Sequence, residues 1–166
     1  MVTPRFTYIA VLTAMLSPVA TASAQNSASA TVSANVQQPI TVTKTNDLSF
    51  GQVFPGLNNS VAVTASGAAA FSIQGQASAN VNLTFTLPTN ISSSSNTLPI
   101  ASWVGLYNTT NSSASGTAFT PSTSATSATL SSGGALYVFI GATAQPSISQ
   151  VAGTYTGTAT MTVVYF

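Results

Sequence analysis

Hydrophobic and polar residues alternate along most of the sequence after Gln25, with the period of two that is typical of half-buried strands. The clearest case is the stretch from Gly153 to Phe166, in which five threonines fall on one face. Its opposite face carries Tyr155, Gly157, Ala159, Met161, Val163 and Tyr165. The pattern predicts one long strand here and an all-β domain as a whole.

Turn-forming Ser, Asn, Gly and Pro residues divide the pattern into eight or nine expected strands, at the spacing of a β-sandwich. The short apolar run 133–142 is bounded by glycines and predicts a buried strand, and 98–107 predicts a central strand with Trp103 in the core. Tyr107 is expected to be exposed and Gly51 to mark a bulge. We expect strands at 27–36, 40–45, 47–54, 61–66, 69–75, 81–87, 98–107, 133–142 and 153–166, and loops at 89–97 and 108–117.

The sequence contains no His and no Cys, and its charged side chains are Arg5, Lys44 and Asp47. General acid–base catalysis and metal sites need imidazole, thiolate or several carboxylates. We therefore expect no catalytic site, no metal site and no cofactor. A Ser–Lys arrangement around Lys44 is the one enzymatic alternative, but no spacing selects a serine partner. Lys44 and Asp47 are instead expected to form a surface ion pair.

The first 24 residues have the features of a secretory signal peptide. Arg5 supplies the basic region, residues 6–16 the apolar region, and the small residues 22–24 the cleavage site. No later segment has the roughly 20 apolar residues that a spanning helix needs. We expect an exported protein, in the periplasm and then at the cell surface or outside the cell, with an extension at 25–38 and one β-sandwich domain at 39–166.

After removal of residues 1–24, the formal side-chain charges are those of Lys44 and Asp47, which cancel. Nucleic-acid binding is not expected, because no basic patch is available to displace counterions from phosphates. A neutral chain has little self-repulsion, which favours association. The composition therefore indicates a structural subunit that associates with itself or with related subunits.

Gly153 is fourteenth from the end of the sequence and Tyr165 is penultimate, a pairing that resembles the C-terminal pattern of chaperone–usher pilus subunits. The wider pattern is similar to an exported bacterial domain-of-unknown-function family related to spore coat protein U. That similarity extends from Ile40 to Phe166. It is carried by ITVTKTNDLSFGQVFPG, FSIQGQASANVNLTFTLPT, GGALYVFIGA and AGTYTGTATMTVVYF.

The resemblance implies an immunoglobulin-like antiparallel β-sandwich that lacks one strand of its own. In such subunits a periplasmic chaperone, and then the N-terminal extension of the next subunit, fills the gap by strand addition, and an outer-membrane usher receives the subunit. The donor strand would present Ala28, Ala30, Val32, Ala34 and Val36. The residues implied in assembly and chaperone contact are Gly153, Tyr155, Met161, Val163, Tyr165 and Phe166.

Two features depart from that family's usual pattern, since the chain has no disulfide and its extension carries mainly alanine in place of large residues and a central glycine. One alternative is that residues 27–36 form the first strand of a complete sandwich. Another is a monomeric extracellular binding module, for glycans, that uses the Asn/Ser/Thr-rich loops around Asn90 and Asn108.

Overall fold

The computed structural model describes residues 26–166, and these form an antiparallel β-sandwich of immunoglobulin-like type without helices. The expected signal peptide at 1–24 lies outside the described residues. Two units are described separately, 26–35 and 36–166. The strands are β1 (Thr41–Asn46), β2 (Asn59–Val61), β3 (Ala69–Gln74), β4 (Asn80–Thr86), β5 (Asn90–Ser93), β6 (Asn96–Asn108), β7 (Thr117–Phe119), β8 (Thr126–Thr129), β9 (Ala135–Ala144) and β10 (Thr160–Tyr165).

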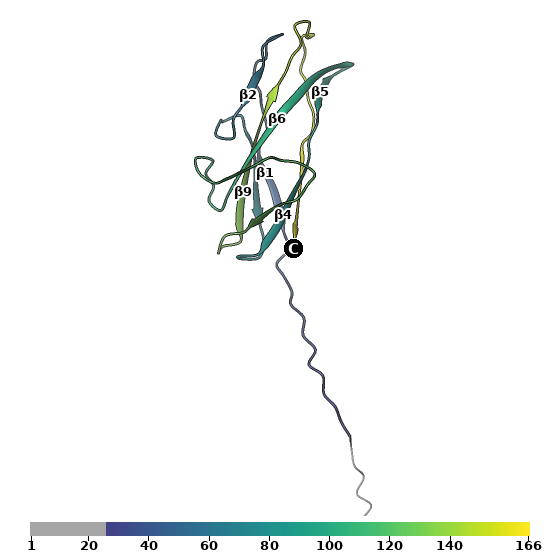
Figure 1. The fold of residues 1–166 in the computed structure, drawn as a ribbon, viewed down its shortest axis with the longest axis vertical. Coiled ribbons are helices and arrows are strands. Elements are labelled where there is room, and N and C mark those ends of the chain that lie inside the picture. The colour runs from purple at the N-terminus through teal and green to yellow at the C-terminus, as the bar shows by residue number, and fades with distance from the viewer. Residues whose placement is uncertain (1–25) are drawn as a thin grey trace, which may run out of the picture. The chain divides into compact units, whose positions relative to one another are not determined.

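The strands of residues 36–166 form two antiparallel sheets (Figure 1). The larger has the order β1-β3-β9-β6-β5, with β2 added to β9 and β7 added to β6. The smaller has the order β10-β4-β8. Strands far apart in sequence are therefore neighbours, as where Thr160 of β10 lies opposite Thr86 of β4. The all-β sandwich expected from the alternating pattern is confirmed.

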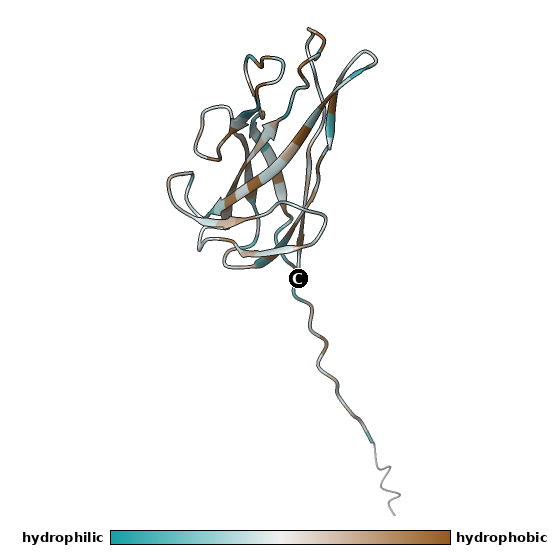
Figure 2. Ribbon diagram, turned by 45° about the horizontal axis from the view of Figure 1, so that its top comes forward, coloured by the Kyte–Doolittle hydropathy of each residue, from teal (hydrophilic) through white to brown (hydrophobic). Residues whose placement is uncertain are grey.

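The core lies between the two sheets and is built from the inward positions of alternating strands. Hydrophobic segments recur along the central strands in Figure 2. The largest fully buried side chains come from β3, β4 and β9, and they are Ile73, Val81, Leu83, Leu136, Val138 and Ile140. A second, smaller cluster contains Leu98, Ile100, Ala142 and Ala144.

Within residues 36–166, the predicted bounds of four segments need correction. Residues 47–54 are not a strand, because the backbone leaves the sheet after Asn46, the last residue of β1. Gly51 has a φ of 64° and lies outside any strand, so the bulge predicted there is wrong. Only Val61 of the predicted strand 61–66 is in a strand, since the chain turns immediately afterwards. Residues 90–93, expected in a loop, form β5 in a tight hairpin with β6 around Ser94, which has a φ of 52°. The predicted strand 153–166 is regular only over β10.

β6 contains a bulge that changes which of its residues face the core. Its pairing with β9 shifts between Ala101 and Val104, and Ser102 has a φ of 50°. Before the bulge the inward residues are even-numbered, as at Ile100, and after it they are odd-numbered, as at Trp103. An extra residue in one strand produces this change, because side chains alternate with a period of two.

The bulge brings two aromatic residues of β6 to the inner side. Trp103, predicted in the core, is half-buried and packs against both hydrophobic clusters. Tyr107 was expected to be exposed, but it is half-buried, because the shifted register turns it towards the main core. Its ring centroid lies 5.9 Å from that of Phe119.

The first described unit, residues 26–35, has no regular secondary structure and all of its residues are exposed. Val32 is 94% exposed. The prediction of a strand at 27–36 is therefore wrong for this structure of the isolated chain. Among residues 26–166, no helix is long and apolar enough to cross a membrane.

Candidate functional site

A groove of about 1050 Å³ opens along one side of the 36–166 domain. One wall is the segment from Lys44 to Pro55, which continues from the end of β1. The other wall is the segment from Gln150 to Ala159, which leads into β10. The first wall adjoins β1 of the larger sheet, and the second wall precedes β10 of the smaller sheet, so the groove lies at an open side of the sandwich.

The base of the groove is hydrophobic and comes mainly from the larger sheet. Five aromatic side chains contribute to its lining, and the residues Ala69, Leu98 and Ile100 below them are buried. Phe54 is 61% exposed, whereas the other four rings are half-buried. The aromatic residues that line the groove are Phe50, Phe54, Phe71, Trp103 and Tyr155.

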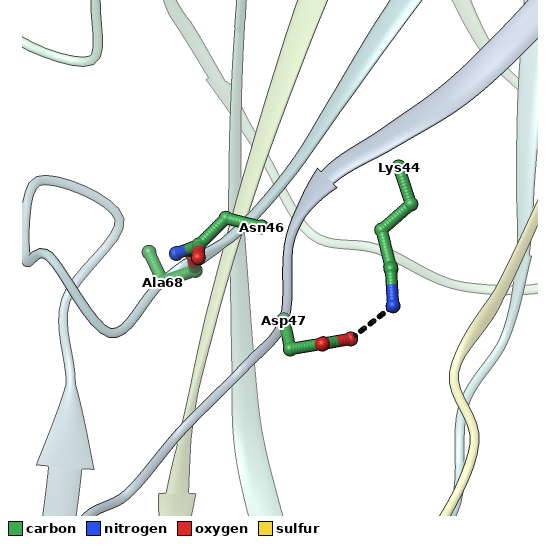
Figure 3. Close-up of polar contacts among 4 residues, drawn as sticks. All are labelled: Lys44, Asn46, Asp47 and Ala68. Carbon is green, nitrogen blue, oxygen red and sulfur yellow. Dashed lines mark hydrogen bonds and ion pairs between the residues drawn. The ribbon is translucent and has the colours of Figure 1, made fainter.

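The polar part of the first wall carries the two charges of the described region. The Lys44 ammonium contacts the Asp47 carboxylate at 2.6 Å, as Figure 3 shows, and both side chains are mostly exposed. The Asn46 side-chain amide donates to the backbone carbonyls of Ser66 and Ala68, at 2.9 and 2.6 Å. The predicted ion pair is confirmed, and the Asn46 bonds fix the end of β1 at the groove's rim.

The second wall is held against β5 by close backbone approach. Ser92 and Thr156 exchange two backbone hydrogen bonds of 2.9 Å. A Cβ atom at Gly153 would lie 2.7 Å from the Ser93 Oγ, and one at Gly157 would lie 2.6 Å from a methyl group of Ile91. Both glycines therefore allow this segment to cross β5 closely, which gives Gly153 a packing role within the domain.

Tyr155 stabilises the same wall through its hydroxyl group. The hydroxyl donates to the Val151 carbonyl at 2.7 Å and accepts from the Gln150 side-chain amide, also at 2.7 Å. Its ring is half-buried and packs against the second hydrophobic cluster. Gly153 and Tyr155 are thus the two predicted assembly residues that line the groove.

The other four predicted assembly residues lie on or beside β10. Met161, Val163 and Tyr165 are half-buried and pack against the main core, as the alternating pattern predicts, whereas Phe166 is 66% exposed. The Tyr165 hydroxyl donates to the Gln38 carbonyl at 2.7 Å, and it accepts from the Gln76 backbone N–H at 2.6 Å. These contacts join β10 to the segment that enters β1.

The strand that adjoins the first wall, β1, and the strand that the second wall leads into, β10, are both edge strands. Within the described part of the chain, β1 pairs with β3 and β10 pairs with β4, and each has an edge that no strand occupies. β1 is exposed along its whole length. An edge strand leaves backbone N–H and C=O groups available to another chain.

The side chains of the predicted donor residues are exposed in this structure. Ala28, Ala30, Val32 and Ala34 belong to the unit without regular structure, and Val36 begins the second unit at 91% exposure. The described structure therefore gives these side chains no burial, and their role stays a prediction.

Sequence reasoning missed the first wall and most of the aromatic lining. Phe50 was assigned to a strand that does not exist, and Trp103 was assigned to the core without a groove beside it. Gly51 and Pro55 could have indicated an irregular segment, because glycine permits positive φ and proline interrupts pairing. Nothing in the sequence signals that the segment ends beside Trp103.

Ionisable side chains are few in the described part of the chain. Residues 26–166 contain no group of three or more His, Cys, Asp or Glu side chains. Lys44 is engaged with Asp47 at the rim. What the groove presents is hydrophobic surface, aromatic rings and free strand edges.

Comparison with known protein families agrees with the extent of the folded domain. A family model described as a domain of unknown function, DUF4402, matches residues 40–165. The chain belongs to the DUF4402 family. The match begins one residue before β1 and ends with β10, so both walls of the groove fall inside the DUF4402 domain. None of the curated proteins matches the chain.

Proposed function

We propose that this protein is a non-enzymatic structural subunit of a bacterial surface assembly, pilin-like, in which the groove accepts a strand from another polypeptide. The observation that supports this most is the position of a hydrophobic groove beside two strands with unpaired edges. Strand addition would pair those backbone groups and cover the half-buried apolar side chains together. The resemblance of the C-terminal Gly153 and Tyr165 pattern to that of chaperone–usher pilus subunits, and of the wider sequence to a family related to spore coat protein U, favours the same function.

The donor in this proposal is residues 25–38 of a second copy or a related subunit. The segment alternates apolar and polar residues and is exposed over residues 26–38. A head-to-tail contact of this kind is heterologous, so it need not close and would extend into a filament. A periplasmic chaperone would cover the groove before assembly, and an outer-membrane usher would bring successive subunits together. Export by the signal peptide precedes both steps.

Main-chain pairing would contribute much of the interaction energy. Val32 and Val36 would each gain about 1.5 kcal/mol from burial, and the alanines less. Each hydrogen bond of the new ladder would add about 0.5–1.5 kcal/mol net. An extension of small residues thus suits a subunit in which backbone pairing dominates.

The experiment is sedimentation of the purified mature protein with and without residues 25–38. We expect the deletion to abolish the assemblies that the complete protein forms. A matched pair of variants keeps the chain length constant: Val32→Asp with Val36→Asp should disrupt assembly, and Thr31→Asp with Asn35→Asp, on the opposite face, should disrupt it much less. Assembly of unchanged size after the deletion would exclude strand donation.

The glycan-binding alternative has weaker support. The Asn108 side-chain amide, at the end of β6 where one of the two polar loops begins, donates to the Ser112 and Ser115 carbonyls at 3.2 and 2.6 Å. Asn90 lies in β5 and not in a loop. Because the Asn108 amide is bonded within its loop and Asn90 is part of a sheet, we rank strand addition first. Binding to a glycan array by a monomeric protein would reverse that order.

A further inference from the structure

Trp103 occupies its place in the groove because of a local backbone conformation that serine adopts rarely. Ser102, next to it, has a φ of 50° within the longest strand of the domain. A regular strand with the same sequence would direct Ser102 inwards and Trp103 outwards. Non-glycine residues at positive φ in strands are uncommon, and they occur most often where a site requires them.

The bulge is therefore what turns a large aromatic ring towards the groove. Trp103 packs against both hydrophobic clusters and remains half-buried, so part of the ring faces the open space. Phe50 and Phe71 lie in the same lining, one from the first wall and one from β3. These rings occupy room that a large side chain of an incoming strand would otherwise take.

The exposed extension has the complementary property. Its apolar face carries alanine at three of its five positions and valine at the other two, in the order Ala28, Ala30, Val32, Ala34 and Val36. Small side chains lose little rotamer entropy when they are ordered, and they fit where the acceptor itself supplies the bulk. If this segment entered the groove of another copy, large acceptor side chains would face small donor side chains.

We propose that Trp103, held in the groove by the Ser102 bulge, is a specificity-determining residue that restricts the inserted strand to small side chains. The inference rests on the proposed function and names the partner as the 26–36 segment of a second copy of this chain. Donor strands with large apolar residues would be refused. The subunit would then select copies of itself over partners with bulky extensions.

The test uses the full mature chain, with larger side chains in the donor segment and a smaller side chain at position 103 of the groove. A variant with Ala28→Leu, Ala30→Leu and Ala34→Leu should assemble about tenfold less tightly or worse, because inserting extra carbons into a filled site is unfavourable. Trp103→Ala added to this variant should restore assembly. The control is Ser29→Leu, Thr31→Leu and Ser33→Leu, which places three leucines on the opposite face and should assemble like the unmodified protein.

Two further measurements guard against an unfolded variant. Circular dichroism should show that the Trp103→Ala variant keeps its strand content. Trp103→Leu removes less side-chain volume and should restore assembly of the triple-leucine variant in part.

Trp103 is the single tryptophan of the chain, so its fluorescence reports on this position alone. Its emission should move to shorter wavelength on assembly of the unmodified protein, because the inserted strand removes water from the ring.

The possible results are distinct. If the triple-leucine donor assembles as tightly as the unmodified protein, or if Trp103→Ala fails to restore a weakened one, the size restriction is wrong and strand donation stands. If Trp103 emission does not change on assembly, the inserted segment does not reach this residue, and the inference is overturned. An unmodified protein that remains monomeric at all concentrations overturns the proposed function and this inference together.

Discussion

The Tyr165 hydroxyl joins the end of β10 to Gln38, a residue 127 positions earlier, through a hydrogen bond of 2.7 Å to its carbonyl. The same oxygen accepts the Gln76 backbone N–H. One phenol group thus connects the smaller sheet to the segment that enters the larger one, at an open side of the sandwich. The penultimate tyrosine of the sequence has a role within the domain, independent of any partner.

Replacing Tyr165 with phenylalanine should lower the free energy of unfolding by about 0.5–1.5 kcal/mol for each hydrogen bond lost, at the lower end because the site is exposed. Denaturant titration measures this difference. Tyr137→Phe is the matched control, because the Tyr137 hydroxyl has no hydrogen-bond partner within residues 26–166. Equal effects of the two substitutions would show that the contacts at Gln38 and Gln76 contribute nothing.

Ser102→Gly should stabilise the domain by roughly 0.5 to 1 kcal/mol. A left-handed conformation costs a residue with a Cβ atom about 1–2 kcal/mol, and glycine avoids most of that cost while losing more entropy on folding. Thermal unfolding measures the gain. Ser72→Gly in β3, where φ is not positive, should destabilise. A stabilised Ser72→Gly or a destabilised Ser102→Gly would mean that the bulge is not strained.

Lys44→Ala should change the free energy of unfolding by less than about 1 kcal/mol, because both partners of the Lys44–Asp47 pair are mostly solvent-exposed. A double-mutant cycle with Asp47→Ala isolates the interaction. The coupling should decrease as salt is added, since mobile ions screen exposed charges. A larger coupling that persists in high salt would contradict an exposed pair.

Leu136→Ala should destabilise the domain by about 2–5 kcal/mol, because the side chain is fully buried between the sheets and its removal leaves a cavity. Leu57→Ala is the control, since Leu57 is 63% exposed, and its effect should stay within about 0.5 kcal/mol. Chemical denaturation of both variants compares them directly. A similar loss of unfolding free energy for both variants would show that the Leu136 side chain is not part of the core.

The sequence predicted the sandwich wherever alternation was continuous. β4 lies within one residue of its expected range, because its buried face repeats every second residue. β9 lies within two residues of its expected range, which was predicted from a short apolar run bounded by glycines. The inward side of β10 was also correct, as Met161, Val163 and Tyr165 show. Periodicity records burial on one face of a strand, so it identifies these elements without a structure.

The groove could not be predicted in the same way, because backbone geometry creates it. Alternation alone gave no sign that β6 changes phase at Ser102, since serine is compatible with an ordinary strand. Residues 47–54 alternate well enough to resemble a strand, yet the chain leaves the sheet after Asn46 and these residues form a wall. Which segments lie opposite one another across a gap depends on tertiary contacts and not on local periodicity.

The wall that leads into β10 is fixed at two points, Thr156 against Ser92 and Tyr165 against Gln38 and Gln76. Between them lie the eight residues from Gly157 to Val164, which span about 27 Å when extended. The distance between these two points sets a length within the domain. Under the proposed function, a donor strand would pair with only about that much backbone before it met one of the two fixed points, and its additional residues would leave the groove at either end.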